Sequence, residues 1–151
     1  MAIPLYLTTA QLIAAVGQVE ARPLPVRTLA KWAAIGVLTP GVQWRGMRRS
    51  PRLYSLRDMA KARLILQLRA AGVSMPKVRV ILAELAARED LRELLRPHSR
   101  AVLEVNGWRT TLHRDGQVAQ EVPSRQLLLP LADVVRGNED AARAVRKRAV
   151  A

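Results

Sequence analysis

The side chains with the plainest chemistry in this sequence are arginines and lysines, and most of the unbalanced ones fall in one stretch. Thirteen of the 25 Lys and Arg residues lie between Arg22 and Arg79, where the only acid is Asp58. The residues before this stretch hold one acid, Glu20, and those after it hold twelve bases against ten acids. Each cationic group can pair with a phosphate, so a positive field focused in this way predicts a surface that binds a polyanion. The alternative interpretation is a solvated basic face that serves solubility alone.

One segment of this stretch has the pattern of a recognition helix. The sequence VRTLAKWAAIG predicts a helix over residues 26–36 that ends at Gly36. The face expected to pack on a core is apolar: Val26, Leu29, Ala30, Ala33 and Ala34. The other face carries side chains that can reach phosphates and base edges in a groove: Arg27, Thr28, Lys31 and the aromatic Trp32. Trp32 is equally compatible with a lid over the core.

A loop rich in arginine follows this helix. Glycine and proline punctuate it between two short segments expected to be extended, residues 37–39 and 52–54. Four arginines lie in or beside the loop: Arg45, Arg48, Arg49 and Arg52. A basic loop between two strands is typical of a wing, which lies along the phosphate backbone or enters the minor groove. Trp44 in this loop is compatible with stacking on DNA or with a core position.

Capping signals predict the helices that must position these two groups. Thr8 and Gln11 have capping-box spacing, which predicts a helix over about residues 8–16 that ends at the segment GQVEARPLP. Ser55 and Asp58 have the same spacing and predict a helix from there through about residue 71. Arg57, in the first turn of that helix, is placed to contact a phosphate.

A fourth helix is expected to begin at Ser74 and Pro76. Its apolar stripe, from Val78 to Leu95, is a candidate dimer interface, and packing on its own domain explains the stripe equally well.

From residue 98 the pattern changes from helices to strands. The pairs Asn106-Gly107 and Asp115-Gly116 are strong hairpin signals and predict a three-strand meander, with a fourth strand in residues 126–135. The last residues, 138–151, predict a charged and frayed helix. The expected fold class is α+β. Residues 1–97 would form a winged helix-turn-helix with a following helix, and residues 98–151 a β-hairpin module with the C-terminal helix.

Several kinds of chemistry lack the residues they need. The chain has no cysteine, which excludes disulfides and thiolate metal sites. His98 and His113 lack the spacing of a metal pair. The acids Glu104, Asp115 and Glu121 have no nucleophile or base beside them, and no glycine loop could cradle phosphates. We therefore expect no enzyme, no cofactor and no metal. Trp108, in the expected hairpin, is interpreted as a packing residue.

An ordered set of motifs resembles the winged helix-turn-helix of the MerR family of transcriptional regulators, over about residues 7–86. The motifs are Thr28-Leu29-Ala30-Lys31-Trp32, Gly36-Val37-Leu38-Thr39-Pro40, Arg52-Leu53-Tyr54, Asp58 and Gly72-Val73-Ser74. The resemblance implies that Arg27, Thr28 and Lys31 meet double-stranded DNA from the recognition helix, with Arg45, Arg48 and Arg49 on the wing. It also implies that Tyr54 and Arg57 contact phosphates.

Two features depart from the family's pattern. Extra residues in GQVEARPLP replace its tight turn between the first two helices, and the helix after Ser74 breaks near Pro97, where the metal and drug sensors of the family have a long coiled coil. The second half is similar instead to compact proteins with a MerR-like head and a hairpin-rich tail, some of which serve as antitoxins.

These observations predict a cytoplasmic, sequence-specific regulator, a repressor that binds DNA as a homodimer because one short helix reads few base pairs. No apolar run approaches the length of a membrane span, and no secretion signal precedes the first apolar run. The alternative is an antitoxin that autoregulates its operon and caps a toxin with residues from about Val102 onward. An RNA-binding or membrane-surface protein would use the same charge, but the capped helices and the wing argue against it.

Overall fold

A computed structural model describes residues 5–40, 42–43, 52–106, 109–114 and 127–150. The chain divides into two compact units. Unit 1 comprises Met1–Leu64 and Gly137–Ala151, and unit 2 comprises Ile65–Arg136, so the boundary falls inside one helix, α3.

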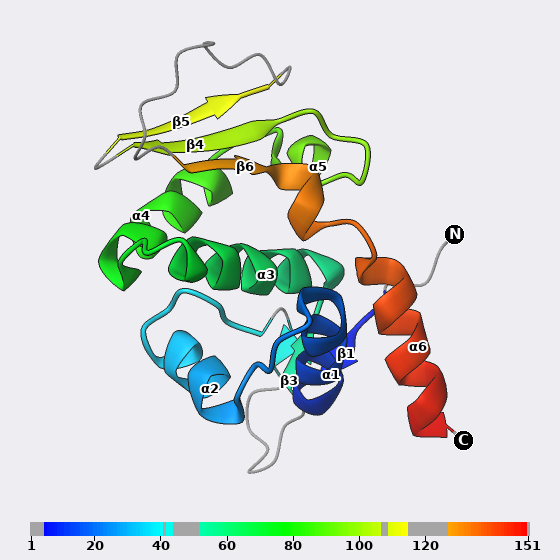
Figure 1. The fold of residues 1–151 in the computed structure, drawn as a ribbon. Helices are drawn as coiled ribbons and strands as arrows, with labels where there is room; N and C mark the ends of the chain where they lie inside the picture. Colours follow the sequence, from blue (N-terminus) through cyan, green and yellow to red (C-terminus); the bar gives the residue numbers. More distant parts are fainter. Residues whose placement is uncertain (1–4, 41, 44–51, 107–108, 115–126, 151) are drawn as a thin grey trace. The chain divides into compact units, whose positions relative to one another are not determined.

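Unit 1 combines helices with a small sheet (Figure 1). Its elements are β1 (Leu7–Thr8), α1 (Thr9–Glu20), α2 (Val26–Ala34), β2 (Val42–Gln43), β3 (Arg52–Tyr54), the first part of α3 (Leu56–Ala70) and α6 (Asn138–Val150). The strands form an antiparallel sheet in the order β1-β3-β2, in which Leu7 lies opposite Tyr54 and Val42 opposite Leu53.

Unit 2 packs helices with a second sheet. Its elements are the rest of α3, α4 (Met75–Ala86), α5 (Leu91–Leu94), β4 (Val102–Asn106), β5 (Arg109–His113), β6 (Leu127–Pro130) and the 3-10 helix η1 (Leu131–Val134). The sheet is antiparallel in the order β5-β4-β6, and Leu103, Val105 and Leu129 are buried in it. Two small antiparallel sheets among helices confirm the α+β fold class.

The capping box at the start of α1 is present as predicted. The backbone N–H of Gln11 donates to the Thr8 hydroxyl at 3.2 Å, and the Gln11 side-chain oxygen accepts from the backbone N–H of Thr8 at 3.0 Å. The predicted end of this helix, near residue 16, was wrong. The helix continues through Gly17 to Glu20 and stops where Ala21 adopts a left-handed conformation, with φ 53°.

The prediction of an extended segment at residues 37–39 was also wrong. The backbone N–H groups of Val37 and Leu38 donate to the carbonyl of Trp32, at 3.0 and 3.4 Å, so this segment closes the end of α2 and forms no strand. The strand lies at β2, five residues further on. Sequence analysis also missed β1, which pairs with β3.

The C-terminal half differs from the expectation in detail. The fourth helix ends at Ala86, and Leu91–Leu94 form a separate short helix. The strand expected in residues 126–135 covers Leu127–Pro130 and continues as η1, and it pairs with β4. The third strand of the expected meander, with the Asp115-Gly116 turn, lies outside the described residues.

The prediction that the last helix is frayed was wrong, because α6 is helical from Asn138 to Val150. Ala141, Ala142 and Val145 of α6 are buried, and α6 packs on α1. Among the helices of the described ranges, none combines the length and the apolar composition needed to cross a bilayer.

Candidate nucleic-acid interface

Helix α2 presents a polar face to solvent and an apolar face to the core. It begins after Pro25, and Gly36, with φ +77°, lies just past its end. Leu29 is 1% exposed, while Arg27 and Lys31 are exposed and Thr28 is half-buried. A helix anchored along one face and cationic along the other can lay its cations in the major groove of DNA.

The division of α2 between core and solvent differs from the expected one. Val26 is 63% exposed, and Ala30 and Ala34 are also exposed. Trp32 takes the place assigned to them, because its ring is 4% exposed and packs in the core. Of its two interpretations, the core position is therefore the one observed, and we remove Trp32 from the proposed DNA contacts. The exposed strip of Val26 and Ala30 lies on the outer face with Arg27 and Lys31.

The two strands beside the expected wing form a ladder. β2 and β3 are antiparallel, and Gln43 lies opposite Arg52. Arg52 is exposed on β3. The other expected wing residues lie outside the described residues: Trp44, Arg45, Arg48 and Arg49. Their contacts with DNA remain predictions from the sequence.

The start of α3 forms a second cationic edge of unit 1. The backbone N–H of Ser55 donates to the Asp58 carboxylate at 2.9 Å, and that of Asp58 donates to the Ser55 hydroxyl at 3.1 Å, which confirms the predicted capping box. This cap fixes the first turn, where Arg57 is exposed. An open hollow of about 480 Å³ lies beside this turn, lined by Leu5, Tyr6, Ser55, Leu56, Arg57, Asp58 and Lys61.

Lys61 is the residue of this edge that the sequence reasoning missed. It follows Arg57 by four positions, and side chains at this spacing lie on the same face of a helix. Both line the hollow. The spacing alone could have placed Lys61 beside Arg57, and it adds a second cation to the expected phosphate contact.

Tyr54 does not have the exposure that the family resemblance implied. Its side chain is 1% exposed, so it is a core residue in this structure and not a surface contact for phosphate. Burial raises the pKa of its hydroxyl above the ordinary value of 10.0, and the hydrogen bond with Thr9 and the charge of Arg52 offset part of this rise. The hydroxyl therefore stays protonated at neutral pH, and we remove Tyr54 from the proposed contacts.

A buried polar cluster joins three helices of unit 1. The Nε of Arg63 on α3 donates to Glu20, the last residue of α1, at 2.8 Å. The guanidinium also donates to the Asn138 side-chain oxygen, at the start of α6, at 2.8 Å. The Arg63 and Glu20 side chains are only 8% and 6% exposed. Burial of a charge requires such partners, so this cluster orients the three helices relative to one another.

The histidines and acids of unit 2 show an ordinary surface pairing. His113 lies 3.0 Å from Glu104, one strand across the sheet, and His98 is exposed. Within the described ranges, no group of three or more potential ligand residues is arranged to hold a metal ion.

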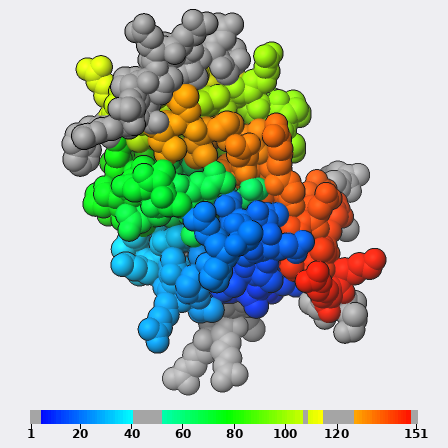
Figure 2. All heavy atoms as spheres, viewed as in Figure 1, coloured from blue at the N-terminus to red at the C-terminus, as the bar shows by residue number. Residues whose placement is uncertain are grey.

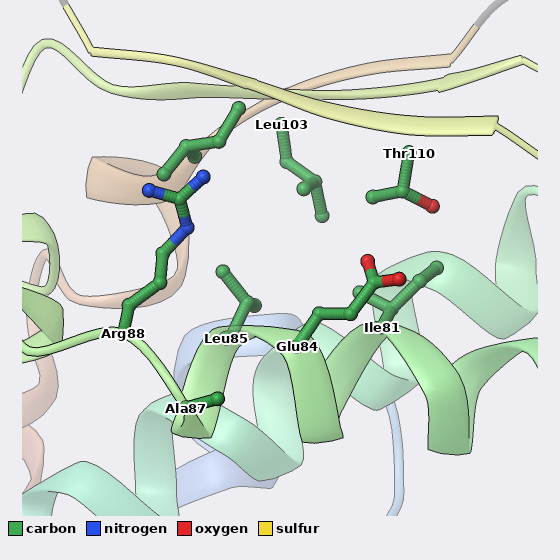
Figure 3. A pocket seen from close by; sticks show the side chains of 8 residues that line it. Ile81, Glu84, Leu85, Ala87, Arg88, Leu103 and Thr110 are labelled. Carbon is green, nitrogen blue, oxygen red and sulfur yellow. The ribbon is translucent and has the colours of Figure 1, made fainter.

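Unit 2 contains a cavity of about 460 Å³ between α4 and the strands β4 and β5 (Figure 3). Ile81, Leu85 and Leu103 contribute apolar surface, and Glu84 and Arg88 project from the helix side toward the strands. This cavity shares no residue with the basic surface of unit 1.

Comparison with known proteins identifies the region that carries the basic surface. Residues 19–85 match the model of a family described as MerR HTH family regulatory protein. The match begins at the end of α1 and spans α2, β2, β3, α3 and nearly all of α4. No curated protein matches the sequence. The match confirms the resemblance to this family over residues 19–85, which lie within the region of about residues 7–86 that the motifs indicated.

Proposed function

We propose that the protein, whose residues 19–85 match the model of the MerR HTH regulatory family, is a sequence-specific DNA-binding repressor that acts as a homodimer in the cytoplasm. The matched family is described as one of helix-turn-helix regulatory proteins. The observation that carries the proposal is the exposure of Arg27 and Lys31 on a helix whose opposite face, at Leu29 and Trp32, is anchored in the core.

The proposal divides the contacts by role. Arg52, Arg57 and Lys61 would pair with phosphates, together with the wing arginines, and such contacts hold DNA without choosing a sequence. Arg27, Thr28 and Lys31 would read base edges in the major groove, where each good bidentate contact contributes about 1 to 3 kcal/mol of discrimination. If about six cations neutralise phosphates, the log–log dependence of the binding constant on salt has a slope of roughly −5.

The test is fluorescence anisotropy with the duplex upstream of the protein's own gene and with a scrambled duplex of equal length, at two salt concentrations. A preference of about a hundredfold or more at about 150 mM salt is expected for a specific regulator. Equal and steeply salt-dependent binding to both duplexes would refute sequence recognition.

Repression is supported by the simplicity of its mechanism, and dimerisation by the short length of the recognition helix. A protein bound over a promoter represses by occupancy alone, whereas activation needs further contacts with the transcription machinery. Helix α2 has nine residues, so two copies on a palindrome would be needed for a useful site length. The stripe from Val78 to Leu95 is a poor interface, because its residues Val78, Ile81 and Leu85 are buried within the chain. Light scattering across a concentration series tests the dimer, and a reporter placed behind the bound promoter tests the sign of regulation.

The antitoxin hypothesis uses the same DNA-binding head but requires a C-terminal segment that a toxin orders. The packing of β4 and β6 through Leu103, Val105 and Leu129 supports the repressor instead, because these strands have a core within the chain. Hydrogen exchange on the isolated protein separates the two. Protection of β4 and β6 without a partner is expected for the repressor, and fast exchange there would favour the antitoxin.

A further inference from the structure

The C-terminal helix α6 belongs to the same compact unit as the helix-turn-helix, although more than 70 residues of chain separate it from the start of α3. It packs along α1, and Figures 1 and 2 show its orange and red segment against the blue N-terminal helix. The contact uses one face of α6, where Ala141, Ala142 and Val145 are buried. The position of α6 is therefore part of the architecture of unit 1.

The start of α6 is also held by the buried polar cluster. Asn138, its first residue, is buried and accepts a hydrogen bond from Arg63 at 2.8 Å, and Arg63 is paired with Glu20 at the end of α1. Since the same guanidinium binds both helices, the direction in which α6 leaves the cluster is tied to the helix-turn-helix.

The far end of α6 carries three adjacent exposed cations: Arg146, Lys147 and Arg148. In the part of the chain that the structure describes, none of the three forms an ion pair. By contrast, Arg143 pairs with Glu139 at 2.8 Å. The acids of the helix, Glu139 and Asp140, lie in its first turn.

The helix dipole accounts for part of this charge distribution. Cations in the last turn stabilise a helix by about 0.3 to 1 kcal/mol. Three neighbouring cations on a unit that is already strongly basic repel one another and the rest of the surface, however, unless an anion lies against them. At 1.5 Å per residue, the last of them stands about 9 Å along the axis beyond the buried Ala142. In Figure 1, α2 lies at the lower left of unit 1 and α6 descends at the right to the C-terminus.

We infer that the C-terminal turn of α6, through Arg146, Lys147 and Arg148, binds backbone phosphates of duplex DNA flanking the site read by α2. This inference rests on the proposed function, because it takes the same duplex as its ligand. It adds a second, sequence-independent contact at the opposite end of the chain and lengthens the DNA that one copy covers.

The test compares the full-length protein with the triple variant Arg146→Gln, Lys147→Gln, Arg148→Gln on two duplexes, one limited to the preferred site and one extended on each side by arbitrary sequence. Binding is measured by anisotropy over a range of NaCl concentrations. On the extended duplex the variant is expected to bind about tenfold or more weakly, with a salt slope that is smaller in magnitude by about 2 to 3, one unit per lost contact. Its preference for the specific over the scrambled sequence is expected to stay unchanged.

A matched control removes the same charge from unit 2 outside the region that matches the family model, with Arg92→Gln, Arg100→Gln and Arg109→Gln, which are all exposed. Circular dichroism verifies that both variants keep their helices. An unchanged slope in the α6 variant, or an equal loss in the control, would overturn the inference. A loss seen on vesicles of anionic lipid but not on DNA would overturn it in favour of a membrane surface.

The outcomes for the two proposals are distinguishable. If the wild type shows no sequence preference, the proposed sequence-specific repressor fails, yet the slopes of wild type and variant can still be compared, because phosphate contacts do not depend on sequence. If the wild type binds no duplex at all, both fail.

Discussion

The buried ion pair between Arg63 and Glu20 makes the substitution Glu20→Gln the most informative test of how unit 1 is held together. The pair is 2.8 Å long, and its side chains are 8% and 6% exposed. Glutamine keeps the size of the side chain and an acceptor oxygen but removes the charge. The guanidinium is then left buried without that carboxylate, and breaking a buried pair on one side typically costs 3 to 5 kcal/mol. Since the oxygen remains, we expect a loss near the lower end of that range, about 3 kcal/mol.

Urea unfolding followed by circular dichroism measures this loss. At an m-value of about 2 kcal/mol/M, the midpoint is expected to fall by about 1.5 M. Glu139→Gln is the matched control, because it breaks the pair with Arg143 at the same distance of 2.8 Å but with side chains that are 66% and 61% exposed. That change is expected to cost less than about 0.5 kcal/mol.

A second variant separates the cost of the unpaired charge from the cost of lost packing. If the charge is the cause, Glu20→Leu combined with Arg63→Met removes both ions and is expected to destabilise less than Glu20→Gln alone. A Glu20→Gln protein within about 1 kcal/mol of wild type, or a double variant worse than the single one, would refute this reasoning.

Three further predictions follow from local features. Gly72→Ala is expected to lower the unfolding free energy by about 1 kcal/mol, because the φ of +89° is strained for alanine although an added Cβ would meet nothing within 4 Å. Gly17→Ala, inside α1, is expected to raise the unfolding free energy by about 0.5 to 1 kcal/mol. Shifts of the two urea midpoints in the same direction would contradict this pair of predictions. Arg27→Gln with Lys31→Gln is expected to lower the anisotropy-measured affinity for the preferred duplex at least about tenfold and to reduce its advantage over the scrambled one, while Arg92→Gln on the other unit changes neither. Because burial raises the pKa of Tyr54, its neutral form is favoured in the folded state, so its contribution to stability is complete below about pH 10 and is lost as pH rises further. Tyr54→Phe is therefore expected to flatten the alkaline fall in unfolding free energy, as measured by urea midpoints at several alkaline pH values, and an equally steep fall in the variant would contradict this.

Local signals predicted most of the helices because their causes are local. The capping boxes at Thr8 and Ser55 join residues three apart, and Gly72 ends α3 through its own backbone conformation. The end of α1 was missed for a related reason. The chain leaves the helix at Ala21, a left-handed residue other than glycine, and such a turn carries no compositional signal.

The errors in the basic surface came from contacts between residues far apart in sequence. Helical periodicity predicted that Val26, Ala30 and Ala34 would be buried. The larger Trp32 is buried instead, so the buried face of α2 is rotated relative to the predicted one. β1 was missed because its partner, Tyr54, is 47 residues away from Leu7 in the chain. The same pairing helps to bury Tyr54, so the expected phosphate contact was lost together with the strand.

The placement of α6 shows why a tertiary contact can escape sequence analysis even when the helix that makes it is predicted. The charges of the last 14 residues were evident, and the sequence predicted a charged and frayed helix there. The sequence did not show that Arg63 is buried, and a buried guanidinium needs hydrogen-bond acceptors. Glu20 supplies one from the end of α1 and Asn138 supplies another from the start of α6. No spacing rule connects positions 20, 63 and 138, yet together these residues fix the start of α6 in unit 1, and hence the position of Arg146, Lys147 and Arg148.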